Sequence, residues 1–114
     1  MAITGAHVLL YSPEADAVRQ TLADVFGWDH VDAGGSWLIF ALPPAELGVH
    51  PSDRAVHELS LMCDDLEATM AELEAKGIEI RGEPEDAGFG VTVKIVLPGD
   101  LEVLLYEPRH PTAV

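Results

Sequence analysis

The sequence predicts an α+β domain in which two βαβββ modules form a curved mixed sheet around a cleft, with the helices outside. The main observation is an internal repeat, because residues 4–50 and residues 57–107 show the same order of strand, helix, loop and further strands. A second observation is that Gly27 and Gly77 each follow a stretch with helical apolar spacing, as glycines that end helices do. A duplicated unit brings matching residues of both halves around one cleft, so the repeat also indicates where a functional site should lie.

Module one is expected to open with a strand at residues 6–11 and to continue with a helix that ends at Gly27. Ser12 and Pro13 favour a helix start, because serine is a good N-cap and proline is well tolerated at the first helical position. Turn residues and apolar runs after the helix predict three strands, at residues 28–31, 37–42 and 46–50.

Alternation along the first strand predicts which of its side chains reach the cleft. Consecutive side chains of a strand point to opposite faces of the sheet. We expect Val8 and Leu10 to pack under the helix, so that His7, Leu9 and Tyr11 face the concave surface.

Module two repeats this order, with a strand at residues 57–63 and a helix that ends at Gly77. Asp64 and Glu67 have the spacing of a capping box before the apolar helix positions. The remaining predicted strands are residues 78–80, 91–97 and 101–106.

The alignment of the two halves leaves one register open. When residues are counted back from the helix-ending glycines, His7 matches Glu58, which would then face the cleft while His57 points away from it. A shift of one residue reverses the two, because it moves every side chain of a strand to the other face. Therefore either His57 or Glu58, but not both, is expected to match His7 and face the cleft.

Length and composition exclude several classes of protein. The 114 residues predict one domain, residues 1–114, with a modest core. The net charge of −14 and the presence of six Lys and Arg residues argue against nucleic acid or an anionic membrane as a partner. No apolar stretch is long enough to cross a bilayer, and the first residues lack the pattern of a secretory signal. The lone Cys63 suits a reducing compartment, so we expect a cytoplasmic protein.

Imidazole and carboxylate side chains recur at matching strand positions and form the candidate functional site. Such a set suits a divalent metal, Fe, Mn, Ni or Zn, with positions open to a substrate. The metal would act as a Lewis acid on neighbouring oxygens of a substrate, and a spare carboxylate would carry protons. The candidate metal ligands, not all expected at once, are His7, His50, His57, Glu58 and Glu102, with Glu46 as an alternative to His50.

Motifs in both halves give the chain a family resemblance. They are AHVLL (6–10), VFGW (25–28), HELSLMCDDL (57–66), AKG (75–77), GFG (88–90), LPGD (97–100) and YEP (106–108). In this order and spacing the chain resembles the vicinal oxygen chelate superfamily, which includes glyoxalases, bleomycin-resistance proteins and extradiol dioxygenases. The resemblance covers nearly the whole chain and implies the glyoxalase-like fold.

The resemblance also implies where metal ligands would lie, on the first and last strands of each module. His7 matches the first position, and Glu58 or His57 matches the opening position of module two. The usual closing glutamate position falls on Leu104, and Glu102 lies one step earlier on the same face.

Two functional interpretations follow and remain open. One is a metal-dependent lyase, isomerase or dioxygenase, which is favoured by His7 and Glu102. The other is a metal-free protein that binds or sequesters a small aromatic or cationic molecule in an acidic cleft, which is favoured by Leu104. In both, we expect a small-molecule partner and a homodimer, because half-open sheets with free edges tend to pair between chains.

Overall fold

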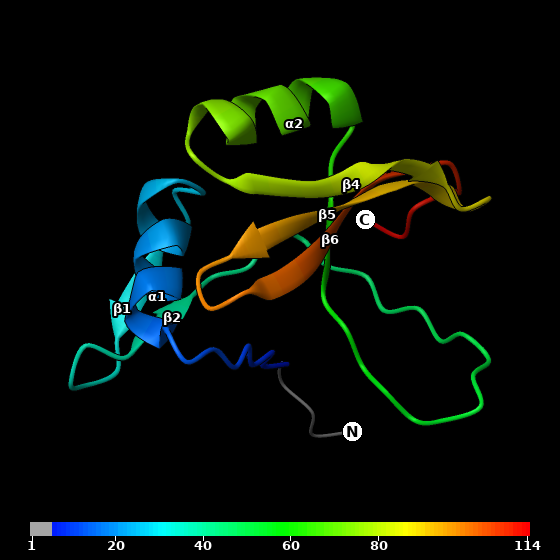
Figure 1. The fold of residues 1–114 in the computed structure, drawn as a ribbon. Helices are drawn as coiled ribbons and strands as arrows, with labels where there is room; N and C mark the ends of the chain where they lie inside the picture. Colours follow the sequence, from blue (N-terminus) through cyan, green and yellow to red (C-terminus); the bar gives the residue numbers. More distant parts are fainter. Residues whose placement is uncertain (1–5) are drawn as a thin grey trace.

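The computed structural model describes residues 6–114 and has an α+β architecture. Positions 4 and 5 of the expected first module, and the start of the chain considered for a signal, lie outside the described residues. Figure 1 shows helix α2 over one face of a sheet, with helix α1 beside the far end of that sheet. Within residues 6–114, neither helix is long and apolar enough to span a bilayer.

Module two forms a four-stranded mixed sheet covered by α2 (Figure 1). In the order β3-β6-β5-β4, β3 runs parallel to β6, and the other neighbours are antiparallel. The elements are β3 (Ser60–Met62), α2 (Leu66–Ala75), β4 (Glu79–Asp86), β5 (Gly90–Leu97) and β6 (Leu101–Pro108). The closing strand of the module thus pairs directly with its opening strand.

The core follows from the alternation of apolar residues in β5 and β6. Val93, Ile95 and Leu97 are buried on one face of β5, whereas Lys94 between them is exposed. Val103 and Leu105 of β6 are buried next to them in the same cluster. This period of two is typical of a sheet with one face packed against a helix.

Helix α2 begins one residue later than the capping-box spacing predicted. Its N-cap is Asp65, not Asp64, and the Asp65 carboxylate accepts a hydrogen bond of 3.0 Å from the Ala68 N–H. Glu107 of β6 accepts a second bond, also 3.0 Å, from the Leu66 N–H. Because Glu107 reaches the helix from the adjacent sheet, the position of the cap depends on tertiary contacts as well as on local sequence.

Module one contains fewer paired strands. Its elements are α1 (Ala15–Asp24), β1 (His30–Asp32) and β2 (Leu38–Phe40), and β1 and β2 form a two-stranded antiparallel sheet. Val18 and Leu22 of α1 are buried in the same cluster as the core of the large sheet.

Two strands predicted in module one, at residues 6–11 and 46–50, are not formed. In module two the opening strand is stabilised by pairing with the closing strand, β3 with β6. The closing segment of module one lies between Pro44 and Pro51, whose nitrogens cannot donate to a ladder, and it has no strand partner within the described part of the chain. Residues 6–11 therefore lack the neighbour that would make them a strand.

The other strand predictions hold with shifted ends. The strand expected at residues 57–63 is limited to β3, and those expected at 28–31 and 37–42 correspond to β1 and β2. The strand expected at 78–80 extends to Asp86 because a bulge between Arg81 and Glu85 lets β4 follow β5 further.

Ser12 links the two modules instead of capping α1. Its hydroxyl donates a 2.8 Å hydrogen bond to the Pro98 carbonyl in the β5–β6 turn and accepts a 3.1 Å bond from the Glu14 N–H. The N-cap of α1 is Glu14, which makes no side-chain cap bond. Gly99 lies in the left-handed region at φ +82°, and a Cβ there would collide with Ser12 and Pro13. The turn and the start of α1 thus pack closely.

Candidate functional site

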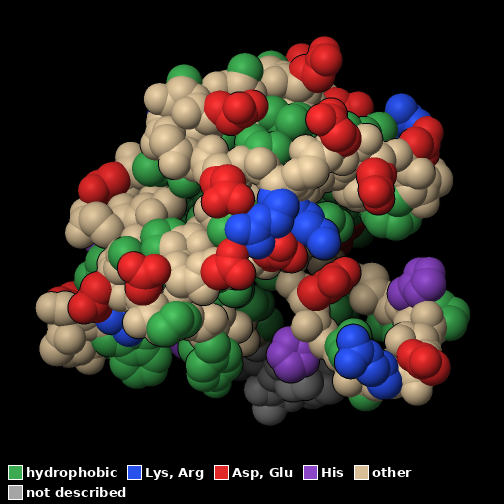
Figure 2. Space-filling model, viewed as in Figure 1, with side chains coloured by type: hydrophobic (Ala, Val, Ile, Leu, Met, Phe, Trp, Pro, Cys, Tyr) green, Lys and Arg blue, Asp and Glu red, His purple; other side chains and the backbone are tan. Residues whose placement is uncertain are grey.

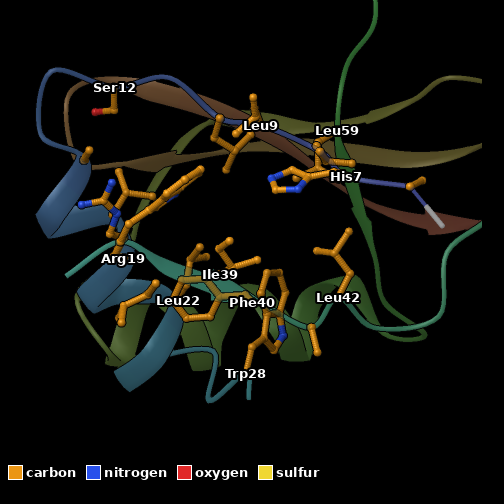
Figure 3. A pocket seen from close by; sticks show the side chains of 18 residues that line it. His7, Leu9, Ser12, Arg19, Leu22, Trp28, Ile39, Phe40, Leu42 and Leu59 are labelled. Atoms are coloured by element: carbon orange, nitrogen blue, oxygen red, sulfur yellow. The ribbon is translucent and has the colours of Figure 1, made fainter. Parts of the chain in front are cut away.

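The candidate site is a cavity of about 380 Å³ in module one, between residues 6–12, α1 and β2 (Figure 3). Its walls are mainly apolar, and three aromatic rings line it: Trp28, Trp37 and Phe40. Leu22 closes the cavity on the helix side, and Leu59, which precedes β3, belongs to the wall near His7 (Figure 3).

Few polar side chains reach this cavity. The His7 imidazole points into it, and Arg19 lies at its opposite end on α1 (Figure 3). Ser12 also lines the wall, although its hydroxyl is engaged with Pro98 and Glu14. Pockets that bind small molecules typically combine an apolar lining with a few such polar groups.

The cavity is not acidic, in contrast to the acidic cleft expected for a metal-free binding protein. Among residues 6–114, no Asp or Glu side chain lines it. The acidic side chains are instead spread over the outer surface, as the face in Figure 2 shows. The net charge of −14 thus describes the surface of the protein and not the environment of a bound molecule.

The expected alternation of side chains along residues 7–10 is not observed. His7, Val8, Leu9 and Leu10 all contribute to the cavity wall. The alternation rule applies to a pleated strand, and this segment is not held in one. The lack of strand pairing therefore explains why the side chains expected under the helix and those expected in the cleft both line the cavity.

Glu102 does not line the cavity with His7. Its carboxylate accepts a 2.7 Å hydrogen bond from the Arg81 guanidinium and lies 3.6 Å from the Lys94 ammonium. The bond to Arg81 holds the pKa of Glu102 below its ordinary range. Arg81 also pairs with Glu79 and Asp100, so Glu102 belongs to an ion-pair cluster on the sheet surface.

The remaining metal-ligand candidates also lie outside the cavity wall. His50 has its Nδ1 2.7 Å from the Pro51 carbonyl oxygen and is exposed. His57 and Glu58 are both exposed, so neither of the two registers places an imidazole or carboxylate in the wall. Glu46 accepts a 2.6 Å hydrogen bond from the Ala113 N–H.

The donor atoms described here do not fit a metal centre. Among residues 6–114, no group of three or more His, Cys, Asp or Glu side chains is placed so that it could hold a metal ion. His7 faces the cavity without a second candidate ligand beside it in the wall. The ligand set of the sequence analysis therefore stays a prediction.

Arg19 is the charged site residue that sequence reasoning missed, and the aromatic lining by Trp28, Trp37 and Phe40 was missed as well. Arg19 directly follows Val18 of the buried helix stripe, so its side chain leaves the helix at the border between core and solvent. The chain has only six Lys and Arg residues, and a cation beside an apolar helix stripe is a signal that could have drawn attention to this position.

Cys63 lies outside the cavity wall, and its surroundings disfavour the thiolate. Its Sγ donates to the Tyr106 carbonyl at 3.6 Å, and burial raises the pKa of the thiol. Since the thiolate is the nucleophilic form, a raised pKa makes Cys63 less reactive.

Comparison with known proteins identifies the fold. No family model matches the chain, and no curated protein matches it in sequence. Among solved structures, the chain is similar to TnmS3, an antibiotic binding protein from Streptomyces sp. CB03234, at 22% identity and a TM-score of 0.68, over 95% of this chain and 98% of that one. It is also similar to lactoylglutathione lyase from Agrobacterium tumefaciens, at 20% identity and a TM-score of 0.65, over 91% and 92% of the two chains.

A third similar structure is the integron cassette protein VCH_CASS1 from V. cholerae, at 16% identity and a TM-score of 0.62, over 94% of this chain and 97% of that one. The chain therefore has a glyoxalase-like fold, as its motifs indicated. At these identities the likeness defines the fold, and one fold of this kind serves several functions.

Proposed function

We propose that this protein binds a small organic molecule in the cavity between residues 6–12, α1 and β2. The observation that carries the proposal is the combination of three aromatic rings and an apolar wall with few polar groups. The volume of about 380 Å³ falls within the range of about 300–1,000 Å³ that is usual for ligand pockets. One structural neighbour is an antibiotic binding protein and another is a lyase, so both binding and catalysis occur on this fold.

A neutral fluorescent probe tests the proposal. Trp28 and Trp37 are the two tryptophans of the chain, and both line the cavity. N-phenyl-1-naphthylamine should saturate one site, gain emission and quench tryptophan fluorescence. Trp37→Ala should weaken its binding at least about tenfold, because stacking on an aromatic ring is lost.

The matched control is Phe89→Ala. Phe89 is a half-exposed aromatic residue that packs on Tyr106 with ring centroids 5.7 Å apart, outside the cavity wall. Binding that is equally weakened by Phe89→Ala, or that does not saturate, would contradict the proposal. Far-UV circular dichroism of each variant distinguishes loss of the site from loss of the fold.

A metal-dependent reaction is the second candidate function, and the position of His7 favours it. His7 presents an imidazole to the cavity, and imidazole is both a common metal ligand and a proton carrier. Elemental analysis after equilibration with Fe, Mn, Ni or Zn tests this function. Near-stoichiometric metal that is lost in His7→Ala but kept in Glu102→Ala, whose carboxylate pairs with Arg81 outside the cavity wall, would support it, and a metal content below one-tenth in all four cases would reject it.

We also propose that the protein is a homodimer. Leu47 and Val49 are 92% and 93% exposed, and Val56 is exposed on the same connection between the modules. This connection projects from the body of the molecule (Figure 1), and exposed apolar side chains in such a place indicate a contact surface. The unpaired edges of β3 and β4 offer further surface for a second copy.

Sedimentation equilibrium tests the homodimer. The wild-type chain should sediment with twice the 12.2 kDa mass of one chain, and the double variant Leu47→Ser with Val49→Ser should shift to the single-chain mass. Val114→Ser, which changes an exposed valine of the C-terminal tail, should leave the mass unchanged. A wild-type protein that is monomeric at about 100 µM would contradict the proposal.

A further inference from the structure

We propose that the molecule bound in this cavity is an aromatic anion, with its flat ring among the aromatic residues and its acidic group at Arg19. This inference rests on the proposed binding function and names the class of ligand. It keeps the aromatic ligand that the sequence analysis allowed for a metal-free protein and differs from the cationic ligand allowed there, because the cavity wall is not acidic.

The charges of the cavity wall favour an anion. Within the described part of the chain, Arg19 is the one Lys or Arg residue in the wall, and no carboxylate accompanies it there. A bound cation would meet the Arg19 guanidinium, whereas the carboxylate paired with Arg19, that of Asp16, lies outside the wall. A bound carboxylate, sulfonate or phenolate would gain a charge-assisted hydrogen bond, which is about twice as strong as a neutral one.

Arg19 has donors left for such a group. A guanidinium carries five N–H donors, and Arg19 uses one nitrogen, NH1, in a 2.7 Å bond to the Asp16 carboxylate. The Arg19 side chain is 28% exposed, whereas that of Asp16 is 90% exposed. An ion pair with so exposed a partner contributes little, about 0–1 kcal/mol, so a ligand anion can share or replace Asp16.

The distant acidic surface does not cancel this preference. Charges farther away than a Debye length, about 8 Å at physiological salt, are largely screened where solvent separates them. A direct contact with Arg19 is not screened in this way, because the surrounding apolar wall lowers the local dielectric. Local charge therefore determines which ligand is favoured, and the net charge mainly lowers the association rate of anions.

The ring of the ligand would lie among Trp28, Trp37 and Phe40. Aromatic pairs are favourable when ring centroids are about 4.5–7 Å apart, and three such side chains border one space. His7, at the end opposite Arg19, supplies a hydrogen-bonding group for a polar substituent at the far side of the ring (Figure 3). The cavity has the volume of about a dozen water molecules, which suits one or two fused rings with substituents.

Three probes with one ring system test the inference by isothermal titration calorimetry at 150 mM salt. They are 2-naphthoate, 2-naphthamide and 2-naphthylmethylammonium, which are anionic, neutral and cationic. We expect the naphthoate to bind at least about fivefold more tightly than the amide, and the ammonium to bind most weakly. An amide or ammonium that binds as tightly as the naphthoate would overturn the inference.

Variants on α1 locate the charge. Arg19→Gln should weaken naphthoate binding about tenfold and change amide binding less than twofold. Arg19→Lys should bind naphthoate more tightly than Arg19→Gln but less tightly than the wild type, because the positive charge remains although the planar set of guanidinium N–H donors is lost. Asp16→Asn should tighten naphthoate binding about twofold, since it removes the carboxylate that competes for Arg19.

The outcomes also separate this inference from the proposed function. If the three probes bind with equal affinity and Trp37→Ala weakens them equally, the pocket binds small molecules without preference for anions. If Arg19→Gln weakens the naphthoate and the amide to the same extent, Arg19 acts on the shape of the pocket, and the inference is wrong. If none of the probes binds, and the neutral dye does not bind either, the proposed function itself is wrong.

Discussion

The two modules have similar sequence patterns but differ in how their strands are paired. In module two, β3, β6, β5 and β4 form a continuous sheet, and the core gathers on the face under α2. In module one, β1 and β2 pair with each other, while residues 6–11 and 46–50 have no ladder partner among residues 6–114. The comparison shows that a strand-like sequence forms a strand only where a neighbour accepts and donates its backbone hydrogen bonds.

The same difference explains why the cavity lies in module one. Where strands pair and side chains alternate, as in β5, apolar residues interdigitate and fill the interior. Where the opening segment is unpaired, its side chains border a space of about 380 Å³ between α1 and β2. A loosely paired module is therefore compatible with a binding site, whereas the tightly paired module supplies stability.

The largest expected effect lies in the paired module. Ile95 has no exposed surface and sits at the centre of β5, so Ile95→Ala should lower the free energy of unfolding by about 3–4 kcal/mol. Val31→Ala on β1, at an exposed position, should change it by less than about 0.5 kcal/mol. Urea unfolding followed by circular dichroism measures both, and equal losses would contradict the contrast between the modules.

The buried residues of α1 should show an intermediate effect. Leu22 belongs to the core cluster and also borders the cavity, so it has fewer contacts to lose than Ile95. Leu22→Ala should cost about 2 kcal/mol in the same urea experiment. The same variant enlarges the pocket, so it should change the affinity for N-phenyl-1-naphthylamine, whereas Ile95→Ala should not. A cost as large as that of Ile95→Ala would mean that module one is packed as tightly as module two.

The helix caps offer a smaller contrast. Asp65→Ala removes the side-chain bond to the Ala68 N–H at the start of α2 and should cost about 1 kcal/mol. Glu14→Ala at the start of α1 removes no such bond and should change the free energy of unfolding by less than about 0.3 kcal/mol. Thermal melts of the two variants test the difference. A larger loss of stability for Glu14→Ala than for Asp65→Ala would show that the Glu14 side chain caps α1, in contrast to the structure.

The smallest expected effect is the pH dependence contributed by Glu102. Arg81 lowers the pKa of Glu102 in the folded protein, so this pair stabilises the fold above the ordinary glutamate pKa of about 4.3. The contribution should be lost as the pH falls through the lowered pKa. Melting temperatures measured from pH 7 to pH 3 should therefore fall slightly less for Glu102→Gln than for the wild type. A steeper fall for the variant would mean that the pair does not form in solution.

Many features of the fold were predictable from the sequence because their causes are local. The end of α2 just before Gly77 and the alternation in residues 91–97 require nothing beyond neighbouring residues, whereas α1 ends at Asp24, three residues before Gly27. The unpaired segments at 6–11 and 46–50 were not predictable, since their apolar alternation resembles that of β3 and β6. Whether a partner strand lies alongside is a property of the whole chain.

The candidate site was predictable in part. His7 was expected to face the cleft, and it lines the cavity. Glu102 was expected to face the same way, but its carboxylate is bound to Arg81, which comes from a neighbouring part of the sheet. The pairing of Glu102 depends on the register of β4 and β5 against β6, which sequence spacing alone did not specify.

By itself, the sequence determined the class of the fold, the acidic surface and the place of His7 near the cleft. These depend on composition, on periodicity and on glycine or proline at single positions, which act over a few residues. Only the tertiary structure decided which strands pair, that the cavity is aromatic and free of carboxylates within the described residues, and that Arg19 rather than Glu102 borders it. The physical reason is that backbone pairing and cavity lining join residues far apart in the chain, and the free energy of these contacts is not contained in any local pattern.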